Sequence, residues 1–261
     1  MKPEDIAGLM IPATWLAMLA VEAMGTGRAW PAVRWWRTRS FAFFIMVMTL
    51  NALLPGLLPP AVTALHVFDL GRLGVPAAVV VGYLCLSLAS ALVHRAFHRF
   101  DPLWRWVHQL HHSPTRLDIG GGVVFTPYEI AISVLVFQLV VVFLLGVDPL
   151  SAAILGYVSV FFSLFQHFNV RTPKWLGYLI QRPESHGVHH RRGMHAYNYA
   201  DLPLWDILMG TFRNPRRFDG EVGFEAAADQ RLAPMFVGHD ANLALYGPRS
   251  RGSRDAMSNP A

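Results

Sequence analysis

The sequence predicts an all-α integral membrane protein, with four to five transmembrane helices and a helical cytosolic cap that holds a histidine cluster. Three observations predict this fold class. Hydrophobic residues make up 53% of the 261 residues and charged residues only 15%, whereas soluble domains carry about 25% charged residues. Several apolar stretches approach the length of about 20 residues that crosses the hydrocarbon core of a bilayer. Finally, ten of the twelve histidines lie between residues 94 and 195.

Five apolar stretches are candidate transmembrane helices. The first contains Glu22 and is the weakest candidate, so the count becomes four if this stretch lies in the membrane interface. The last two are separated by Gly146-Val147-Asp148-Pro149, which favours a tight reversal, and we expect them to form a helical hairpin. The candidates cover residues 7–24, 41–60, 73–93, 128–146 and 149–166.

The distribution of arginines predicts the orientation of the chain. Cytosolic loops of membrane proteins carry an excess of Lys and Arg. Here arginines gather between the first and second stretches, after the third and after the fifth, whereas the opposite loops hold little beyond Arg72. We therefore expect a multi-pass protein whose active site lies on the cytosolic face. The net charge of +5 resides in loops beside apolar runs, which fits a membrane surface and not a nucleic-acid partner.

These features divide the chain into five parts. Two polar segments should pack together as the cap, and the end of the chain is predicted to be disordered because it is rich in Gly, Pro, Ser and Arg. The parts are transmembrane helices one to three (1–93), a cytosolic segment with two histidine clusters (94–127), the helical hairpin (128–166), a cytosolic cap with the third cluster (167–245) and the tail (246–261).

The spacing of the histidines predicts a metal site. Residues three and four apart share a helix face, so we expect each cluster to present two or three imidazoles to one side. Three such faces and His167 could enclose two ions. Without metal, so many imidazoles would repel one another whenever protonated. The candidate ligands are His94, His98, His108, His111, His112, His167, His186, His189 and His190, with His195, Asp118 and Asp206 as candidates for additional ligands or for partners of the ligand rings.

Carboxylates near the clusters could accept hydrogen bonds from the ring nitrogens. Asp118, Glu129 and Asp206 have this interpretation, although a helix cap or a surface position is at least as common for each. The isolated His66 and His239 are expected to have no role at the site.

The number of histidines favours two ions over one. Imidazole suits zinc, copper, iron and nickel, and the single cysteine, Cys85, excludes a Cys-x-x-Cys thiolate site. One zinc needs about four ligands. Two iron ions would use most of the histidines and leave positions open for dioxygen, although the residues alone do not decide between iron and zinc.

The clusters resemble the three histidine boxes of the fatty acid hydroxylase and sterol desaturase superfamily of membrane di-iron enzymes. His167-Phe168-Asn169 resembles the extra histidine often found between the second and third boxes. The resemblance covers about residues 80–213. The sequence departs from the usual pattern at Arg182-Pro183-Glu184-Ser185, where a Thr-Pro pair is more common, and at His195. The matching segments are 91–99, 103–113 and 186–190, followed by Asn198-Tyr199, Trp205-Asp206 and Gly210-Thr211-Phe212.

This resemblance implies a membrane oxidoreductase with two non-haem iron ions and dioxygen as co-substrate. Its substrate would be a lipid from the bilayer, such as a sterol or a fatty acyl chain, and the reaction would be hydroxylation or desaturation. The sequence has no Gly-x-Gly-x-x-Gly motif for a nucleotide. We therefore expect an external electron donor, namely a ferredoxin, a cytochrome or a reductase.

Three other classes remain open, and one of them, a bis-histidine haem protein, would need far fewer histidines. A membrane zinc hydrolase would use the same ligands, although a zincin motif has Glu directly after its first histidine and this chain has Arg95. A non-catalytic metal-binding or transport protein is the third alternative. Transporters usually place their ligands near the midplane of the bilayer, whereas these clusters lie beyond the ends of the apolar stretches.

Overall fold

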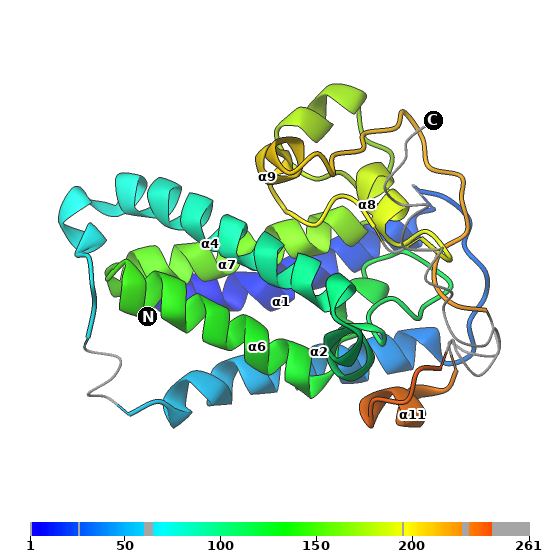
Figure 1. Ribbon diagram of the computed structural model, residues 1–261, viewed down its shortest axis with the longest axis horizontal. Coiled ribbons are helices and arrows are strands. Elements are labelled where there is room, and N and C mark those ends of the chain that lie inside the picture. Colours follow the sequence, from blue (N-terminus) through cyan, green and yellow to red (C-terminus); the bar gives the residue numbers. More distant parts are fainter. Residues whose placement is uncertain (1, 26, 60–64, 195, 226–229, 242–261) are drawn as a thin grey trace.

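The chain forms a bundle of long helices with shorter helices gathered toward one end, as the computed structural model shows (Figure 1). The structure describes residues 2–25, 27–59, 65–194, 196–225 and 230–241. Within these ranges the regular elements are helical, and strand-like pairing is limited to an isolated bridge between Arg191 and Val222. The predicted all-α fold class is therefore confirmed.

Five helices are long and apolar enough to cross a membrane, judged by length and composition. The candidate that contains Glu22 is among them, so the described chain has five candidate spans and not four. Two of the spans consist of an α-helix that continues into a short 3-10 helix or π-helix. The spans are α1 (Pro3–Ala23), α2 (Trp36–Leu53) with the 3-10 helix η1 (Leu54–Leu57), α4 (Val75–Arg99), α6 (Pro127–Phe137) with the π-helix η5 (Gln138–Leu144), and α7 (Pro149–His167).

The outer surface of these helices is apolar. Large side chains such as Leu9, Phe41, Ile45, Leu92 and Leu139 are exposed. Soluble monomers rarely expose large continuous apolar surfaces, but a bilayer covers them. This is the architecture of an integral membrane protein, as the composition predicted.

Short helices connect or cap the spans. One of them, η3, is a π-helix that carries the first histidine of the second cluster. The short elements are η2 (Leu70–Leu73), α5 (Asp101–Leu103), η3 (Trp104–His108), η4 (Gly121–Val123), η6 (Lys174–Tyr178), α8 (Pro183–His189), α9 (Pro203–Leu208) and α11 (Leu232–Phe236).

Successive spans run in opposite directions, so that α1, α4 and α7 finish at the end of the bundle where α2 and α6 begin (Figure 1). We call this the histidine end. The helices α1 and α4 pack against α7, and α2 packs against α6. The side chain of Leu155 on α7 packs against Gly82 of α4, where an added Cβ would lie 2.7 Å from Leu155 Cδ1. Trp15 of α1 stacks on Phe44 of α2 with 4.3 Å between ring centroids.

The chain reverses direction between the last two spans. Gly146 has a φ of +58°, which is the left-handed region that glycine tolerates best. The carboxylate of Asp148 then caps α7 by accepting hydrogen bonds from the backbone N–H groups of Leu150 and Ser151. Because the chain reverses within a few residues, α7 returns to the histidine end, where α6 began.

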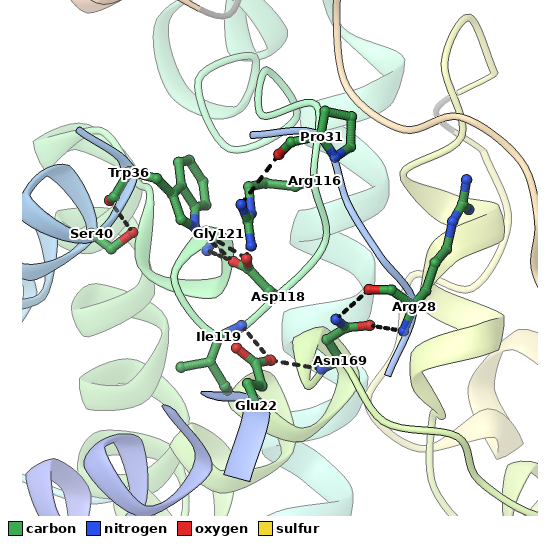
Figure 2. Close-up of polar contacts among 10 residues, drawn as sticks. All are labelled: Glu22, Arg28, Pro31, Trp36, Ser40, Arg116, Asp118, Ile119, Gly121 and Asn169. Atoms are coloured by element: carbon green, nitrogen blue, oxygen red, sulfur yellow. Dashed lines mark hydrogen bonds and ion pairs between the residues drawn. The ribbon is translucent and has the colours of Figure 1, made fainter. Parts of the chain in front are cut away.

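Glu22, the residue that weakened the first candidate span, connects α1 to loops at the histidine end. Its Oε1 accepts hydrogen bonds from the backbone N–H groups of Ile119 and Asn169, at 2.9 and 2.7 Å (Figure 2). The amide of Asn169 in turn bonds to the backbone of Arg28 through both its oxygen and its nitrogen. The carboxylate therefore lies at the helix end and organises two loops, which is why an apolar helix can accommodate it.

Candidate metal centre

The structure brings all nine predicted histidine ligands together at the histidine end. They form two groups, and within each group the nearest ligand atoms lie within 4.8 Å of one another. Each group could hold a metal ion. The first group is His94, His98, His108, His112 and His189, and the second is His111, His167, His186 and His190.

The two groups cut across the second and third sequence clusters. Each cluster presents two imidazoles to one group, within the expected two or three, but the second and third clusters each give one histidine to the other group. Histidines four apart stay together: His108 and His112 belong to the first group, and His186 and His190 to the second. The middle histidine of each triplet lies in the other group, because the side chains of adjacent residues on a helical turn point about 100° apart. His111 therefore joins the second group and His189 the first. Both triplets contribute to both groups.

Within each group the Nε2 atoms converge. In the first group the Nε2 of His108 lies 3.0 Å from the Nε2 atoms of both His94 and His112. In the second group, the Nε2 of His186 lies 3.1 Å from that of His167 and 3.0 Å from that of His190. The donor atoms of several imidazoles thus surround a common point.

Hydrogen bonds on the opposite ring nitrogens fix the tautomers. The Nδ1 atoms of His94, His189 and His167 lie 2.7–2.8 Å from backbone carbonyl oxygens, and Nδ1 of His108 lies 2.7 Å from Oε1 of Glu129. A carbonyl or carboxylate oxygen accepts, so each Nδ1 carries the proton and donates it. Each neutral ring therefore presents a bare Nε2 lone pair to its group.

This donor set fits a cation. Two bare nitrogens at 3.0 Å, such as those of His94 and His108, repel unless a cation or a shared proton lies between them. Protonation is disfavoured, since burial lowers the pKa of His111, His112, His186 and His190, and neighbouring imidazoles lower it further. Neutral imidazoles with their lone pairs aimed at one point are the arrangement that a metal ion requires.

A loop after the third cluster supplies two of the carbonyl groups. The carbonyl of Tyr197 accepts from His189, and the carbonyl of Tyr199 accepts from His94. Asn198 between them has a φ of +48°, and its amide bonds to the backbone of Ser185 and Arg213. The predicted Asn-Tyr pair is thus a turn that aims two carbonyl oxygens at ligand rings.

Asp206 belongs to neither group and shapes this same loop. Its carboxylate accepts hydrogen bonds from the backbone N–H groups of Tyr199 and Ala200, each at 2.9 Å, and from the hydroxyl of Thr211 at 2.6 Å. Burial raises its pKa. Asp206 therefore affects His94 indirectly, because it positions the backbone of Tyr199, whose carbonyl accepts from the His94 ring.

Asp118 is also outside both groups. Its carboxylate accepts hydrogen bonds from Nε1 of Trp36, from Arg116 and from the backbone N–H of Gly121 (Figure 2). This loop continues into Gly122, which touches His167 so closely that an added Cβ would lie 2.9 Å from the His167 Cβ. Asp118 thus acts on the second group by holding the loop that backs one of its rings.

His186 has a side-chain amide as its Nδ1 partner. The Nε2 of Gln181 lies 2.8 Å from His186 Nδ1 and 2.6 Å from the Oε1 of Gln166, whose own Nε2 lies 3.4 Å from Asp201. Burial raises the pKa of Asp201 to about 6. Sequence reasoning did not identify these residues, because no spacing rule connects an amide to a histidine five residues away in a non-helical turn.

A cavity of about 440 Å³ runs from the histidines into the bundle. The side chains of His94, His108, His111 and His167 line one end of it. Apolar residues of α2, α4, α6 and α7 line the remainder, with scattered hydroxyl and amide groups. Its volume is typical of sites that bind a small molecule or part of a lipid.

The other residues singled out in the sequence are a carboxylate near the clusters and the histidines outside the nine candidate ligands. Glu129 accepts a hydrogen bond from His108, as anticipated for a carboxylate near the clusters. His66 and His239 belong to neither group. His195 and the tail 246–261 lie outside the described residues.

Comparison with known proteins supports the same site. A family model described as fatty acid hydroxylase matches residues 79–211, just over half of the chain. The ornithine lipid hydroxylase OlsE of Rhizobium tropici is 34% identical over 145 residues, which cover 53% of this chain and 43% of that protein. The chain thus spans less than half of the length of this relative. No solved structure matches the chain.

Proposed function

The chain belongs to the fatty acid hydroxylase family, and we propose that it is a membrane oxidoreductase that uses two non-haem iron ions and dioxygen to hydroxylate a lipid. The observation that carries the proposal is the division of nine buried or half-buried histidines into two groups with converging Nε2 atoms. The first group would hold one ion and the second group the other.

The number of donor atoms supports ions with more than four ligands. The first group offers five imidazoles and the second offers four, whereas a structural zinc ion takes about four ligands in total. Iron accepts a higher coordination number, so it could bind these imidazoles and still have positions for dioxygen.

The bound metal would supply oxidation of a C–H bond, in which one atom of dioxygen enters the substrate while two external electrons and two protons convert the other to water. The residues of this chain position the reactants. The carbonyl groups of Tyr197, Tyr199 and Ser163 keep the Nδ1 protons of three ligands in place, so that the Nε2 atoms remain available. Burial of the site excludes water and thereby limits side reactions.

The cavity supports a lipid substrate. Residues that line it follow α7 from His167 through Ser163 and Ser159 to Gly156, which at 1.5 Å per residue is a path of about 16 Å. Much of this path is apolar, and it lies inside the candidate membrane spans. A hydrocarbon chain could enter it with its reacting carbon beside the histidines. The name of the relative from Rhizobium tropici also supports a membrane lipid and hydroxylation as the reaction.

We further propose that the histidine end faces the cytosol. Its connecting loops carry Arg28, Arg34, Arg105, Arg116 and Arg171, whereas the described loops at the other end carry Arg72. This asymmetry agrees with the excess of positive charge in cytosolic loops. The same basic surface would suit an acidic electron carrier, such as a ferredoxin.

Metal analysis combined with turnover tests this function. We expect protein purified without dioxygen to contain close to two iron ions per chain. We also expect it to convert a membrane lipid to a product heavier by one oxygen atom when a reductant and dioxygen are supplied, with label incorporated from ¹⁸O₂. Two zinc ions with hydrolytic activity, or metal uptake into vesicles without dioxygen consumption, would replace this proposal by one of the alternative classes.

A further inference from the structure

Glu129 has one satisfied carboxylate oxygen and one unsatisfied oxygen. Oε1 accepts the hydrogen bond from His108 Nδ1 at 2.7 Å. Oε2 is buried and has no hydrogen-bond partner in the described part of the chain, and the side chain is only 7% exposed. Leaving a buried acceptor unpaired is unfavourable, and more so when it is charged. Since Glu129 lines the cavity, the missing partner can come from a molecule bound there.

The rest of the cavity favours the same kind of partner. Hydroxyl and amide groups, including Ser90, Ser133 and Ser163, lie among its apolar residues. Of the described residues that line it, none is Lys or Arg. The second carboxyl group, Asp201, already has Tyr83 and Gln166 at its two oxygens. Among the carboxyl groups that line the cavity, Glu129 therefore has the oxygen that a bound molecule can satisfy.

Metal binding would keep Glu129 an acceptor. When His108 holds an ion through Nε2, its Nδ1 must carry the proton that Glu129 accepts. Carboxylates commonly accept in this way from histidines that bind metal. Oε1 is thereby committed to His108, and Oε2 is the carboxylate oxygen left for a molecule in the cavity.

We propose that Glu129 Oε2 binds an N–H or O–H group of the lipid substrate. The segment of the lipid that lies beside the first histidine group would then carry a hydroxyl, amide or ammonium group. The inference rests on the proposed function in that a lipid occupies the cavity, and it adds the chemical class of that lipid.

A binding experiment without dioxygen tests the inference separately from catalysis. Metal-loaded protein in nanodiscs is equilibrated with a radiolabelled long-chain primary alcohol. The label is then displaced by two unlabelled compounds of one chain length, the alcohol and its methyl ether. We expect the alcohol to bind on the order of 10-fold more tightly than the ether.

Two variants test whether Glu129 is the residue that causes the preference for the alcohol over the ether. In Glu129→Gln an amide oxygen can still accept from His108, but an NH₂ group replaces the free acceptor, so the preference for alcohol over ether should shrink to less than about 2-fold. His239→Ala changes an exposed residue that does not line the cavity, and it should leave the preference intact. Metal content is measured for both variants.

Wild-type protein that binds the ether as tightly as the alcohol would overturn the inference, as would Glu129→Gln protein that retains both metal and the preference. Because no turnover is needed, failure of the inference leaves oxygen-dependent activity open to separate measurement. Failure of the proposed function would appear in metal content and ¹⁸O incorporation.

Discussion

His111 and His112 are neighbours in the sequence, yet their imidazoles belong to different histidine groups. Their ring planes are 88° apart. The Nε2 of His111 lies 3.2 Å from that of His167, whereas the Nε2 of His112 lies 3.0 Å from that of His108. One short turn of chain therefore serves both candidate ion sites and fixes their separation.

Replacement of these two histidines should affect the two ions separately. His111→Ala removes one of four imidazoles from the second group, and His112→Ala removes one of five from the first. We expect each variant to lose turnover and to retain close to one iron ion in place of two. The metal per chain is measured by plasma mass spectrometry, and the two sites are distinguished by Mössbauer spectroscopy. His189→Ala should behave like His112→Ala.

His239→Ala is the matched control, because His239 is exposed and lies outside both groups. It should retain both iron ions and full activity. Full metal content in His111→Ala or His112→Ala protein would remove that residue from the proposed ligand set. Loss of both ions in each variant would mean that the two groups act as one cooperative site.

The sequence predicted the helical class, the approximate spans and all nine histidines that converge, because apolar length and histidine spacing are local properties. It did not predict the division into groups. Spacing shows that His108 and His112 share a face, but the assignment of His111 depends on where α7 brings His167. The hydrogen bonds that the Tyr197 and Tyr199 carbonyls accept could not be predicted either, since every residue has a backbone carbonyl and the sequence does not show which ones face a ligand ring. Glu129 was anticipated because a carboxylate near imidazoles is a recognisable pattern.

Gln181 should control metal affinity in the second group. If His186 binds an ion through Nε2, its Nδ1 must keep a proton and needs an acceptor, and the side-chain amide of Gln181 lies 2.8 Å away. The amide oxygen must then face the ring, which requires Gln166 to donate to it. We expect Gln181→Leu to weaken metal binding at this group by about 10- to 100-fold, the usual effect of losing such a partner. The measurement is competition with a chelator.

Gln181→Glu provides the matched comparison, because a carboxylate of similar size can only accept. It should retain metal affinity close to that of the wild type. Equal losses in the Leu and Glu variants would indicate that shape, and not acceptor chemistry, matters at this position.

The stability of the metal-free protein should fall in acid. Burial lowers the pKa of His111, His112, His186 and His190 in the folded chain, whereas the unfolded chain has ordinary values of about 6.5. Below about pH 6.5 the unfolded state therefore binds more protons, and each group lowers the free energy of unfolding by up to about 1.4 kcal/mol per pH unit. Above that pH the effect disappears.

Thermal unfolding of chelator-treated protein in detergent, followed from about pH 7.5 to about pH 5.5, measures this dependence. The Tm should decrease with falling pH, and His190→Gln should reduce the slope. A Tm that is constant over this range would show that these imidazoles titrate normally in the folded protein.

Gly122 should be intolerant of any side chain because it backs His167. A Cβ at this position would lie 2.9 Å from the Cβ and 3.0 Å from the Cγ of His167, closer than side chains normally approach. Either the loop or the ring must move, and the Nε2 of His167 now lies within 3.2 Å of both His111 and His186. We expect Gly122→Ala to lose the ion of the second group and to destabilise the fold by about 1–3 kcal/mol, the usual effect of overpacking.

Gly8→Ala is the control, since Gly8 lies within α1 and an added Cβ there meets nothing within 4 Å. It should leave metal content unchanged and alter stability by at most about 1 kcal/mol. Binding of the labelled alcohol to Gly122→Ala protein distinguishes local displacement of His167 from misfolding, because the cavity persists only in the folded bundle. A Gly122→Ala protein that binds the alcohol and retains both iron ions would show that the His167 ring can shift and still contribute to the second group.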